Sequence, residues 1–294
     1  MERRAAAVLS CSTVAFDGYD LDDAFRGIAE AGFVWVEPAF IEGYASNFSE
    51  ALFSLESARE VRTLLSKHSL QCSGVSGHID LGGSDGVARM ERRIHFCEEV
   101  GSPRLITNAA DARYEGAFYA NMASILAAAA NAGVVICLEN PGNGVPSLVN
   151  DGASAAEVAE RLSSPYVRIN YDGGNTFSHS LKRFPAESDF GPAIPWLEQL
   201  HLKDVRVGPG GVYEYPALGE GEIDFPGMAQ TLRDGSAEGS GGVKVLSLEI
   251  PLRMRRNPDA SPFRLQETLP YDRIVEALKR SRGLAIECFR DFLR

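Results

Sequence analysis

The strongest constraint in this sequence is a series of apolar segments that each end on an acidic residue or a histidine. Residues 134–138, Val-Val-Ile-Cys-Leu, lead directly into Glu139. The segment does not alternate with polar residues, which is typical of a strand buried on both faces. A charged side chain at the end of such a strand is costly unless something pairs with it. Three later segments, at 167–171, 197–200 and 243–248, end in the same way, at Asp172, His201 and Glu249.

Predicted strands and helices alternate along the whole chain at a spacing of roughly 30 residues. The predicted strands are residues 5–10, 33–36, 70–76, 104–107, 134–138, 167–171, 197–200 and 243–248. The predicted helices are residues 21–31, 57–68, 86–100, 114–131, 154–162, 225–234 and 271–282. A proline-containing stretch at 180–195 replaces a clear sixth helix, and residues 205–222 and 251–270 are predicted to be long loops.

This alternation predicts a (β/α)8 TIM barrel, an α/β fold, in a single domain that spans residues 1–294. No Pro/Gly/Ser-rich linker divides the chain near its middle. An open doubly wound sheet is the alternative. The turn after the first strand, residues 11–14, is not rich in glycine, which argues against a dinucleotide-binding fold.

In a barrel of this kind the carboxyl ends of the strands meet at one mouth, so the four strand-end residues are expected to lie together there. One histidine and three carboxylates form a hard donor set that suits Mn²⁺, Mg²⁺, Co²⁺ or Zn²⁺, and no thiolate selects zinc. A shared divalent metal is therefore the main interpretation. The alternative is that each residue pairs with a nearby lysine or arginine.

Several motifs, in this order, carry a resemblance to a known family. They are Glu139-Asn140, Asp172-Gly173-Gly174-Asn175, His201-Leu202-Lys203-Asp204, Leu-Gly-Glu-Gly-Glu-Ile-Asp at 218–224 and Ser247-Leu248-Glu249, with weaker matches at Val36-Glu37 and Ser76-Gly77-His78. The chain resembles the xylose isomerase-like TIM barrel superfamily of sugar phosphate isomerases and epimerases. Tagatose and psicose 3-epimerases, inosose isomerases, inosose dehydratases and type-IV apurinic endonucleases are related to it.

The resemblance implies that Glu139, Asp172, His201 and Glu249 bind one divalent metal ion, with Mn²⁺ as the first choice. It also implies that Glu139 and Glu249 act as an acid–base pair. Abstraction of a proton next to a carbonyl needs a carboxylate on one face and a carboxylic acid on the other, and a metal stabilises the enediolate between them. Lys203 is expected either to contact a substrate oxygen or donate a proton, or to pair with a ligand carboxylate.

Five further residues are expected to bind substrate. Four of them are Glu37, His78, Asn108 and Asn175, each at or just after a predicted strand end. Asn175 stands where many relatives have histidine, so it can hold a hydroxyl group but cannot take a proton near neutral pH. The fifth, Arg206, could hold a hydroxyl, carboxylate or phosphate group; the alternative is a loop arginine in contact with solvent. Arg253, Arg255 and Arg256 follow the last predicted strand, where barrels often bind phosphate, but they are interpreted as part of a charged loop.

The leading functional hypothesis is a metal-dependent isomerase or epimerase of a keto-sugar or related polyol ketone. The first alternative is a dehydratase of inosose or a related keto-sugar, which would use the same metal and base but expel a hydroxyl group. In that reaction Lys203 or His78 could protonate the leaving group. The second alternative is a barrel that binds a sugar without catalysis.

Charge and composition exclude other classes. The formal net charge is −11 and the isoelectric point is near 5.0, which argues against nucleic-acid or anionic-membrane partners. The chain has five histidines, too few outside predicted helices for the multi-zinc site of the endonuclease branch. Five cysteines without a Cys-x-x-Cys pair indicate reduced thiols and a cytoplasmic protein. The expected partners are a small sugar and, by analogy with relatives, other copies of the chain.

Overall fold

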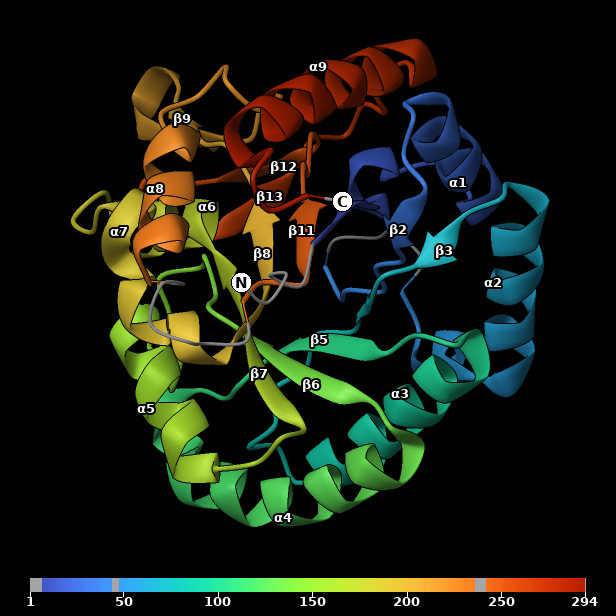
Figure 1. Ribbon diagram of the computed structural model, residues 1–294, viewed down its shortest axis with the longest axis vertical. Coiled ribbons are helices and arrows are strands. Elements are labelled where there is room, and N and C mark those ends of the chain that lie inside the picture. The colour runs from blue at the N-terminus through green and yellow to red at the C-terminus, as the bar shows by residue number, and fades with distance from the viewer. Residues whose placement is uncertain (1–6, 44–47, 236–241, 294) are drawn as a thin grey trace.

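A parallel sheet forms the centre of the computed structural model, which describes residues 7–43, 48–235 and 242–293. Neighbouring strands follow the order β3-β2-β1-β11-β8-β7-β6-β5-β4. The strands are β1 (Val8–Ser12), β2 (Trp35–Glu37), β3 (Gln71–Cys72), β4 (Val75–Ser76), β5 (Arg104–Asn108), β6 (Val135–Glu139), β7 (Val167–Asp172), β8 (Leu197–Leu202) and β11 (Val245–Leu248). Figure 1 shows them surrounded by helices.

The third predicted strand closes the sheet into a barrel, because its two halves pair with opposite ends of the strand order. Its first half, β3, pairs with β2 at one end of the strand order, and its second half, β4, pairs with β5 at the other. The amide of Ser73 also bonds to the carbonyl of Val36, and the amide of Ser76 to the carbonyl of Pro38. This segment therefore bridges the two ends of the sheet, and the predicted (β/α)8 TIM barrel fold is confirmed.

Seven helices cover the strands at the positions predicted for them. They are α1 (Leu21–Glu30), α2 (Leu55–Lys67), α3 (Gly86–Val100), α4 (Glu115–Ala132), α5 (Gly152–Leu162), α8 (Phe225–Gly235) and α9 (Tyr271–Phe289). Local signals fix their ends: the Asp20 side chain caps α1 by accepting from the amide of Asp23, and α3 ends at Gly101 in the left-handed conformation. No described helix has the length and apolarity needed to cross a membrane.

The connection between β7 and β8 contains more helix than predicted. It holds α6 (Gly173–His179), α7 (Ala186–Asp189) and a 3-10 helix (Gly191–Trp196). His179 is the last residue of α6. Three smaller differences are also found. The first strand starts at Val8, with residues 5 and 6 outside the described part, the third strand is interrupted, and α9 continues to Phe289.

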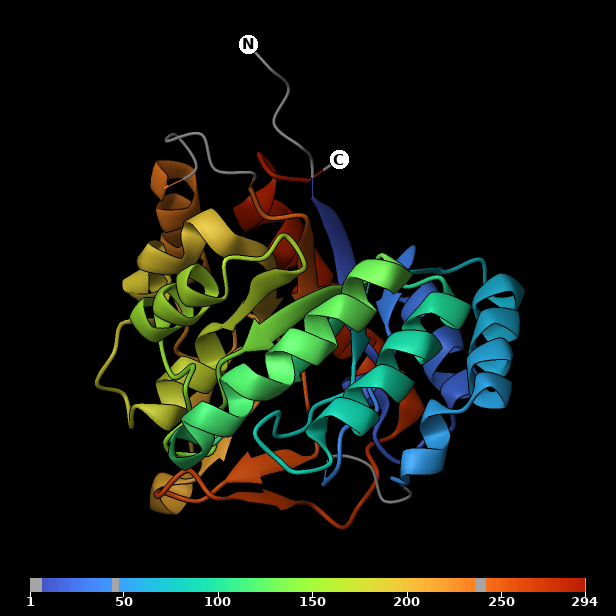
Figure 2. The same ribbon diagram turned by 90° about the horizontal axis from the view of Figure 1, so that it is seen from below.

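The prediction that residues 205–222 and 251–270 are loops is wrong in part, because short strands in these two segments pair with each other. They form a second, antiparallel sheet of β9 (Arg206–Val207), β10 (Tyr213–Glu214), β12 (Met254–Arg256) and β13 (Pro262–Arg264). Single-sequence periodicity could not reveal strands of two or three residues whose partners lie in another loop. We call this the mouth sheet. It lies at the end of the barrel opposite the chain termini (Figure 2).

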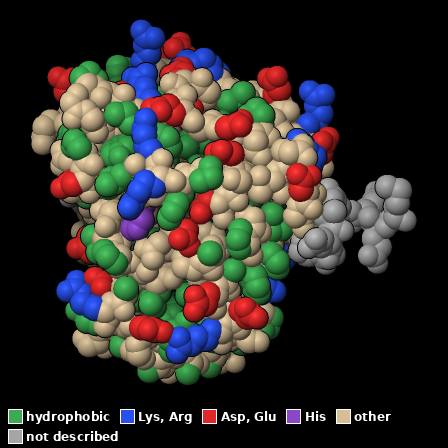
Figure 3. Space-filling view, turned by 90° about the vertical axis from the view of Figure 1, so that its left-hand side faces the viewer, with side chains coloured by type: hydrophobic (Ala, Val, Ile, Leu, Met, Phe, Trp, Pro, Cys, Tyr) green, Lys and Arg blue, Asp and Glu red, His purple; other side chains and the backbone are tan. Residues whose placement is uncertain are grey.

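Acidic and basic side chains are interspersed on the side of the molecule that carries α5, α7 and α8 (Figure 3). This mixture is typical of a protein face in contact with water.

A buried arginine anchors the end of β4 close to the barrel mouth. The Arg93 side chain, on α3, is fully buried and donates from Nε to the carbonyl of Gly77 at 2.9 Å. Its guanidinium group also bonds to both carboxylate oxygens of Glu50, at 2.8 and 2.9 Å, and lies 3.9 Å from the ring centre of Phe53. Hydrogen bonds from Arg93, with Arg89 and Arg92 nearby, lower the pKa of Glu50 to about 2.

We expect Glu50→Gln to lower the free energy of unfolding at pH 7, because the buried Arg93 guanidinium loses its carboxylate partner. The loss should be only roughly 1–2 kcal/mol, because solvent partly screens this site. The pKa of Glu50 is depressed in the folded state, so its contribution is present above its unfolded pKa and is lost as the pH falls toward 2. Denaturant unfolding of both proteins should therefore show a difference that narrows below about pH 4.5. A pH-independent difference would contradict this account.

Candidate metal centre

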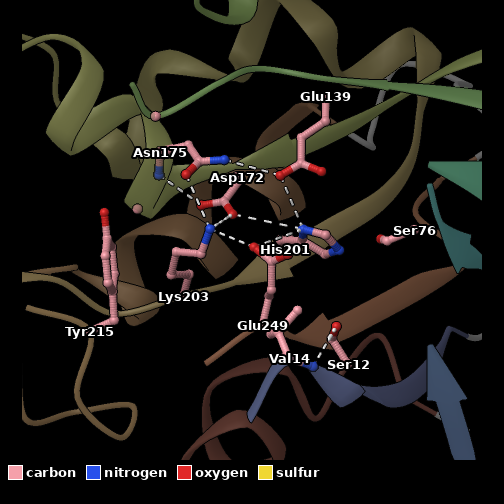
Figure 4. A network of polar contacts seen from close by, with 12 residues as sticks. Ser12, Val14, Ser76, Glu139, Asp172, Asn175, His201, Lys203, Tyr215 and Glu249 are labelled. Atoms are coloured by element: carbon pink, nitrogen blue, oxygen red, sulfur yellow. Dashed lines mark hydrogen bonds and ion pairs between the residues drawn. The ribbon is translucent and has the colours of Figure 1, made fainter. Parts of the chain in front are cut away.

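The four side chains predicted as metal ligands meet at the mouth of the barrel. Three stand on β6, β7 and β8, and the fourth, Glu249, directly follows β11. Their ligand atoms all lie within 4.8 Å of one another, and each residue is at most 2% exposed. Nδ1 of His201 lies 3.3 Å from Glu139, 3.7 Å from Asp172 and 3.6 Å from Glu249 (Figure 4). The arrangement could hold one metal ion.

The charges of this cluster fit a divalent cation. The carboxyl groups of Glu139, Asp172, Glu249 and Glu37 lie around His201 and Lys203. Burial raises the pKa of Glu249 to about 7, although Lys203 and His201 lie beside it. Oε2 of Glu139 is buried and accepts no hydrogen bond from the described residues. An excess of buried negative charge and an unused carboxylate oxygen are what a metal ligand set presents.

The Glu37 side chain holds the other face of His201. Its oxygens lie 3.1 and 3.2 Å from Nε2 of His201, and they also accept hydrogen bonds from Ser76 at 2.7 Å and Gln199 at 2.6 Å. Despite complete burial, His201 lowers the pKa of Glu37 to about 2. A carboxylate on the second ring nitrogen of a metal-binding histidine fixes the ring orientation.

The expectation that Glu37 binds substrate therefore does not match its position. Its carboxylate is fully buried, lies beneath His201 and does not line the cavity described below. Its ion-pair partner is His201.

Lys203 is an ion-pair partner of two ligand carboxylates. Its Nζ lies 2.7 Å from Asp172, 2.5 Å from Glu249 and 3.1 Å from the amide oxygen of Asn175. Lys203 holds the pKa of Asp172 well below its usual range, against the effect of burial. A Cβ at Gly174 would lie 2.8 Å from the Lys203 side chain, so the second glycine of the Asp-Gly-Gly-Asn motif makes room for this lysine.

Two asparagines keep the carboxylates of neighbouring strands in register. The side chain of Asn140 donates to the carbonyl of Asp172 at 2.9 Å and accepts from its amide at 2.9 Å. Asn175 donates to Glu139 at 3.1 Å, while its own amide bonds to the Asp172 carboxylate at 2.8 Å. These contacts tie the carboxyl end of β6 to that of β7.

A cavity of about 360 Å³ opens above the cluster. Glu139 and Glu249 line it, whereas Asp172, His201 and Lys203 lie deeper. Three of the residues expected to bind substrate, His78, Asn108 and Asn175, are in its wall. Nε2 of His78 lies 3.3 Å from the Oε2 atom of Glu139. The structure thus brings these residues together around the two glutamates.

The arginine expected to bind substrate is not in the cavity wall. Arg206 lies on β9, its side chain is 51% exposed and its Nη2 pairs with Glu214 at 2.7 Å. Arg256, interpreted from the sequence as part of a charged loop, lines the cavity instead. The sequence Met254-Arg255-Arg256 shows no apolar–polar alternation, so it gave no signal that Arg256 would be buried at the cavity.

Comparisons with known proteins agree with this fold. The family model described as "Xylose isomerase-like TIM barrel" matches residues 25–260. A comparison with curated proteins finds no match. Among solved structures, a D-allulose 3-epimerase from a Methylomonas species has a TM-score of 0.68 at 15% identity, covering 98% of this chain and 100% of that one. At such identity the likeness shows the fold.

Two other similar structures carry different activities in their names. The 3-keto-D-glucoside 4-epimerase YcjR of E. coli has a TM-score of 0.67 at 17% identity, covering 94% of this chain and 99% of that one. The probable 3-DHS dehydratase AsbF of Bacillus anthracis has a TM-score of 0.65 at 15% identity, covering 94% and 98%. The match of the family model to most of the sequence, together with the closed barrel, shows that this chain belongs to the xylose isomerase-like TIM barrel family.

Proposed function

We propose that this protein is a divalent-metal-dependent isomerase or epimerase of a keto-sugar or related polyol ketone. One observation carries the proposal: of the four clustered ligand residues, Glu139 and Glu249 are the two that line the cavity. Their strands, β6 and β11, are separated in the barrel by β7 and β8. A substrate held between them would meet one carboxyl group on each side.

The proposed reaction is a proton transfer through an enediolate. Glu139 removes the proton from the carbon next to the carbonyl, and Glu249 delivers a proton to the opposite face or to the neighbouring carbon. A bound divalent ion would polarise the carbonyl and hydroxyl oxygens and stabilise the developing negative charge. Asn175 holds the Glu139 carboxylate, and Lys203 balances the charges of Asp172 and Glu249.

Mn²⁺ is the ion we propose, with Mg²⁺, Co²⁺ or Zn²⁺ as alternatives. Carboxylate oxygens and one imidazole nitrogen form a donor set without sulfur, which suits these ions.

We expect the purified protein to carry about one divalent ion per chain, because the cluster forms one site. Elemental mass spectrometry should find this ion in the wild type and find it lost in Asp172→Asn and His201→Ala. The metal-loaded wild type should then convert at least one member of a ketohexose panel, as read by chromatography. If the wild type binds no ion even after Mn²⁺ or Zn²⁺ is supplied, the proposal is wrong.

A dehydratase is the second candidate, and the position of His78 favours it. This histidine lines the cavity close to Glu139, where it could protonate a departing hydroxyl group. A structural neighbour is also described as a probable dehydratase. Incubation with inosose, followed by absorbance and chromatography, separates the two reactions by their products. Binding of a sugar without turnover, with metal present, would support the non-catalytic alternative.

We also propose that residues 1–294 form a single barrel domain and that the protein is cytoplasmic. We further expect the chain to associate with other copies of itself. The five cysteines all lie in the described ranges and are free thiols, which supports a reducing compartment. Light scattering coupled to size-exclusion chromatography measures the oligomeric state.

A further inference from the structure

The wall of the cavity above the metal cluster contains a buried arginine, Arg256. This residue is only 4% exposed although it lies on β12 of the mouth sheet. Among the described residues that line the cavity, it is the only lysine or arginine. The guanidinium group therefore gives the cavity a fixed positive charge at a place that the metal cluster does not explain.

Arg256 is held in place from the mouth sheet and the loop that follows it. Its Nε donates to the hydroxyl of Tyr215 at 2.7 Å, and its Nη1 donates to the carbonyl of Ala260 at 3.3 Å. Tyr215 in turn lies beside Lys203, whose Nζ is 5.7 Å from the ring centre. In Figure 4 Tyr215 is on the side of Lys203 away from His201. Tyr215 thus spaces the guanidinium group from the metal cluster.

The other arginines near the mouth have different roles. Arg253 pairs with Asp17 at 3.2 Å and donates to the carbonyls of Leu265 and Gln266, so it fixes the mouth sheet to the segment after β1. Arg206 points to solvent and pairs with Glu214. Arg256 is the arginine whose side chain reaches the cavity.

We infer that Arg256 forms an anion subsite that recognises a carboxylate at the end of the substrate distant from the metal cluster. This inference rests on the proposed function for the opposite end of the cavity. A guanidinium group matches the two oxygens of a carboxylate in a bidentate pair. The substrate class is then a keto-sugar acid, or a related polyol ketone that carries a carboxylate.

The remaining charges in the cavity wall favour a carboxylate over a phosphate. Glu42, Asp80 and Asp111 also line the cavity. These acidic groups repel a phosphate monoester, whose charge is close to −2 at neutral pH, more strongly than a carboxylate of charge −1.

Titration calorimetry on the Mn²⁺-loaded protein tests the inference without turnover. The carboxylate probe 5-keto-D-gluconate is compared with L-sorbose, its neutral counterpart with the same carbon skeleton, and D-galacturonate is compared with D-galactose. D-Fructose 6-phosphate and D-fructose form the phosphate arm. We expect at least one carboxylate probe to bind roughly tenfold or more tightly than its neutral counterpart. The inference is overturned if neither does, or if only the phosphate is preferred.

Variants locate the effect. Arg256→Gln should abolish the preference for the carboxylate while metal content stays unchanged, and Arg256→Lys should keep part of it because the charge remains without the bidentate geometry. Arg206→Gln, a cation outside the cavity, should bind like the wild type. A preference that survives in Arg256→Gln would also overturn the inference. A carboxylate preference in a protein that isomerises nothing would disprove the proposed reaction but leave the subsite standing.

Discussion

The Glu249→Gln variant is expected to lose formation of the second epimer or isomer while it still exchanges one substrate hydrogen with deuterium from solvent. Glu249 and Glu139 line the cavity from different strands, so removal of one carboxyl group stops one of two proton transfers. Loss of a general acid or base lowers kcat by about 10²–10⁴-fold. The assay uses whichever ketose the wild type converts. Mass spectrometry of substrate recovered from D₂O measures the hydrogen exchange, and chromatography measures product formation.

The mirror-image variant and a neutral control make this test specific. Glu139→Gln should exchange hydrogen with solvent only when the product epimer or isomer is supplied. The metal content of the same preparation is measured to show that the ion is still bound. Glu222→Gln changes a half-exposed glutamate that pairs with Lys182 outside the cavity and should behave like the wild type. Two results would contradict the assignment of one proton transfer to each glutamate. They are full turnover by Glu249→Gln, and loss of exchange in both directions while the metal is still bound.

The positions that the sequence predicted well are those fixed by strand direction. Glu139, Asp172, His201 and Glu249 each lie at or next to the carboxyl end of a parallel strand, and these ends meet at one mouth in a barrel. The cluster follows from the fold without knowledge of any side-chain conformation. His78, Asn108 and Asn175 reach the cavity wall for the same reason.

The positions that the sequence predicted poorly depend on side-chain direction and on pairing between distant loops. Glu37 also ends a strand, yet its carboxylate turns beneath His201, where Ser76 and Gln199 bond to it. Arg206 and Arg256 both follow a barrel strand, and the antiparallel pairing of β10 with β9 and β12 decides which of them faces the cavity. A period-two pattern over two or three residues carries too little information to predict such pairing.

Lys203→Met is expected to destabilise the metal-free protein far more than the metal-loaded one. The lysine is 2% exposed and lies within 2.7 Å of the carboxylates of Asp172 and Glu249. Removal of one partner of a buried ion pair costs about 3–5 kcal/mol, which corresponds to a fall in Tm of roughly 10 °C for a chain of this size. Mn²⁺ would supply positive charge to the same carboxylates, so the deficit should shrink when the ion is bound. Calorimetric unfolding in EDTA and in Mn²⁺ measures both values.

An exposed ion pair of the same length provides the control. Nζ of Lys182 lies 2.7 Å from Glu222, and both side chains are more than 40% exposed. Lys182→Met should therefore change the free energy of unfolding by less than about 1 kcal/mol, with or without Mn²⁺. If Lys203→Met is destabilised equally in EDTA and in Mn²⁺, the ion does not share carboxylates with Lys203. The excess negative charge at the barrel mouth would then have to be neutralised by protonation of Glu249, whose raised pKa already favours that state.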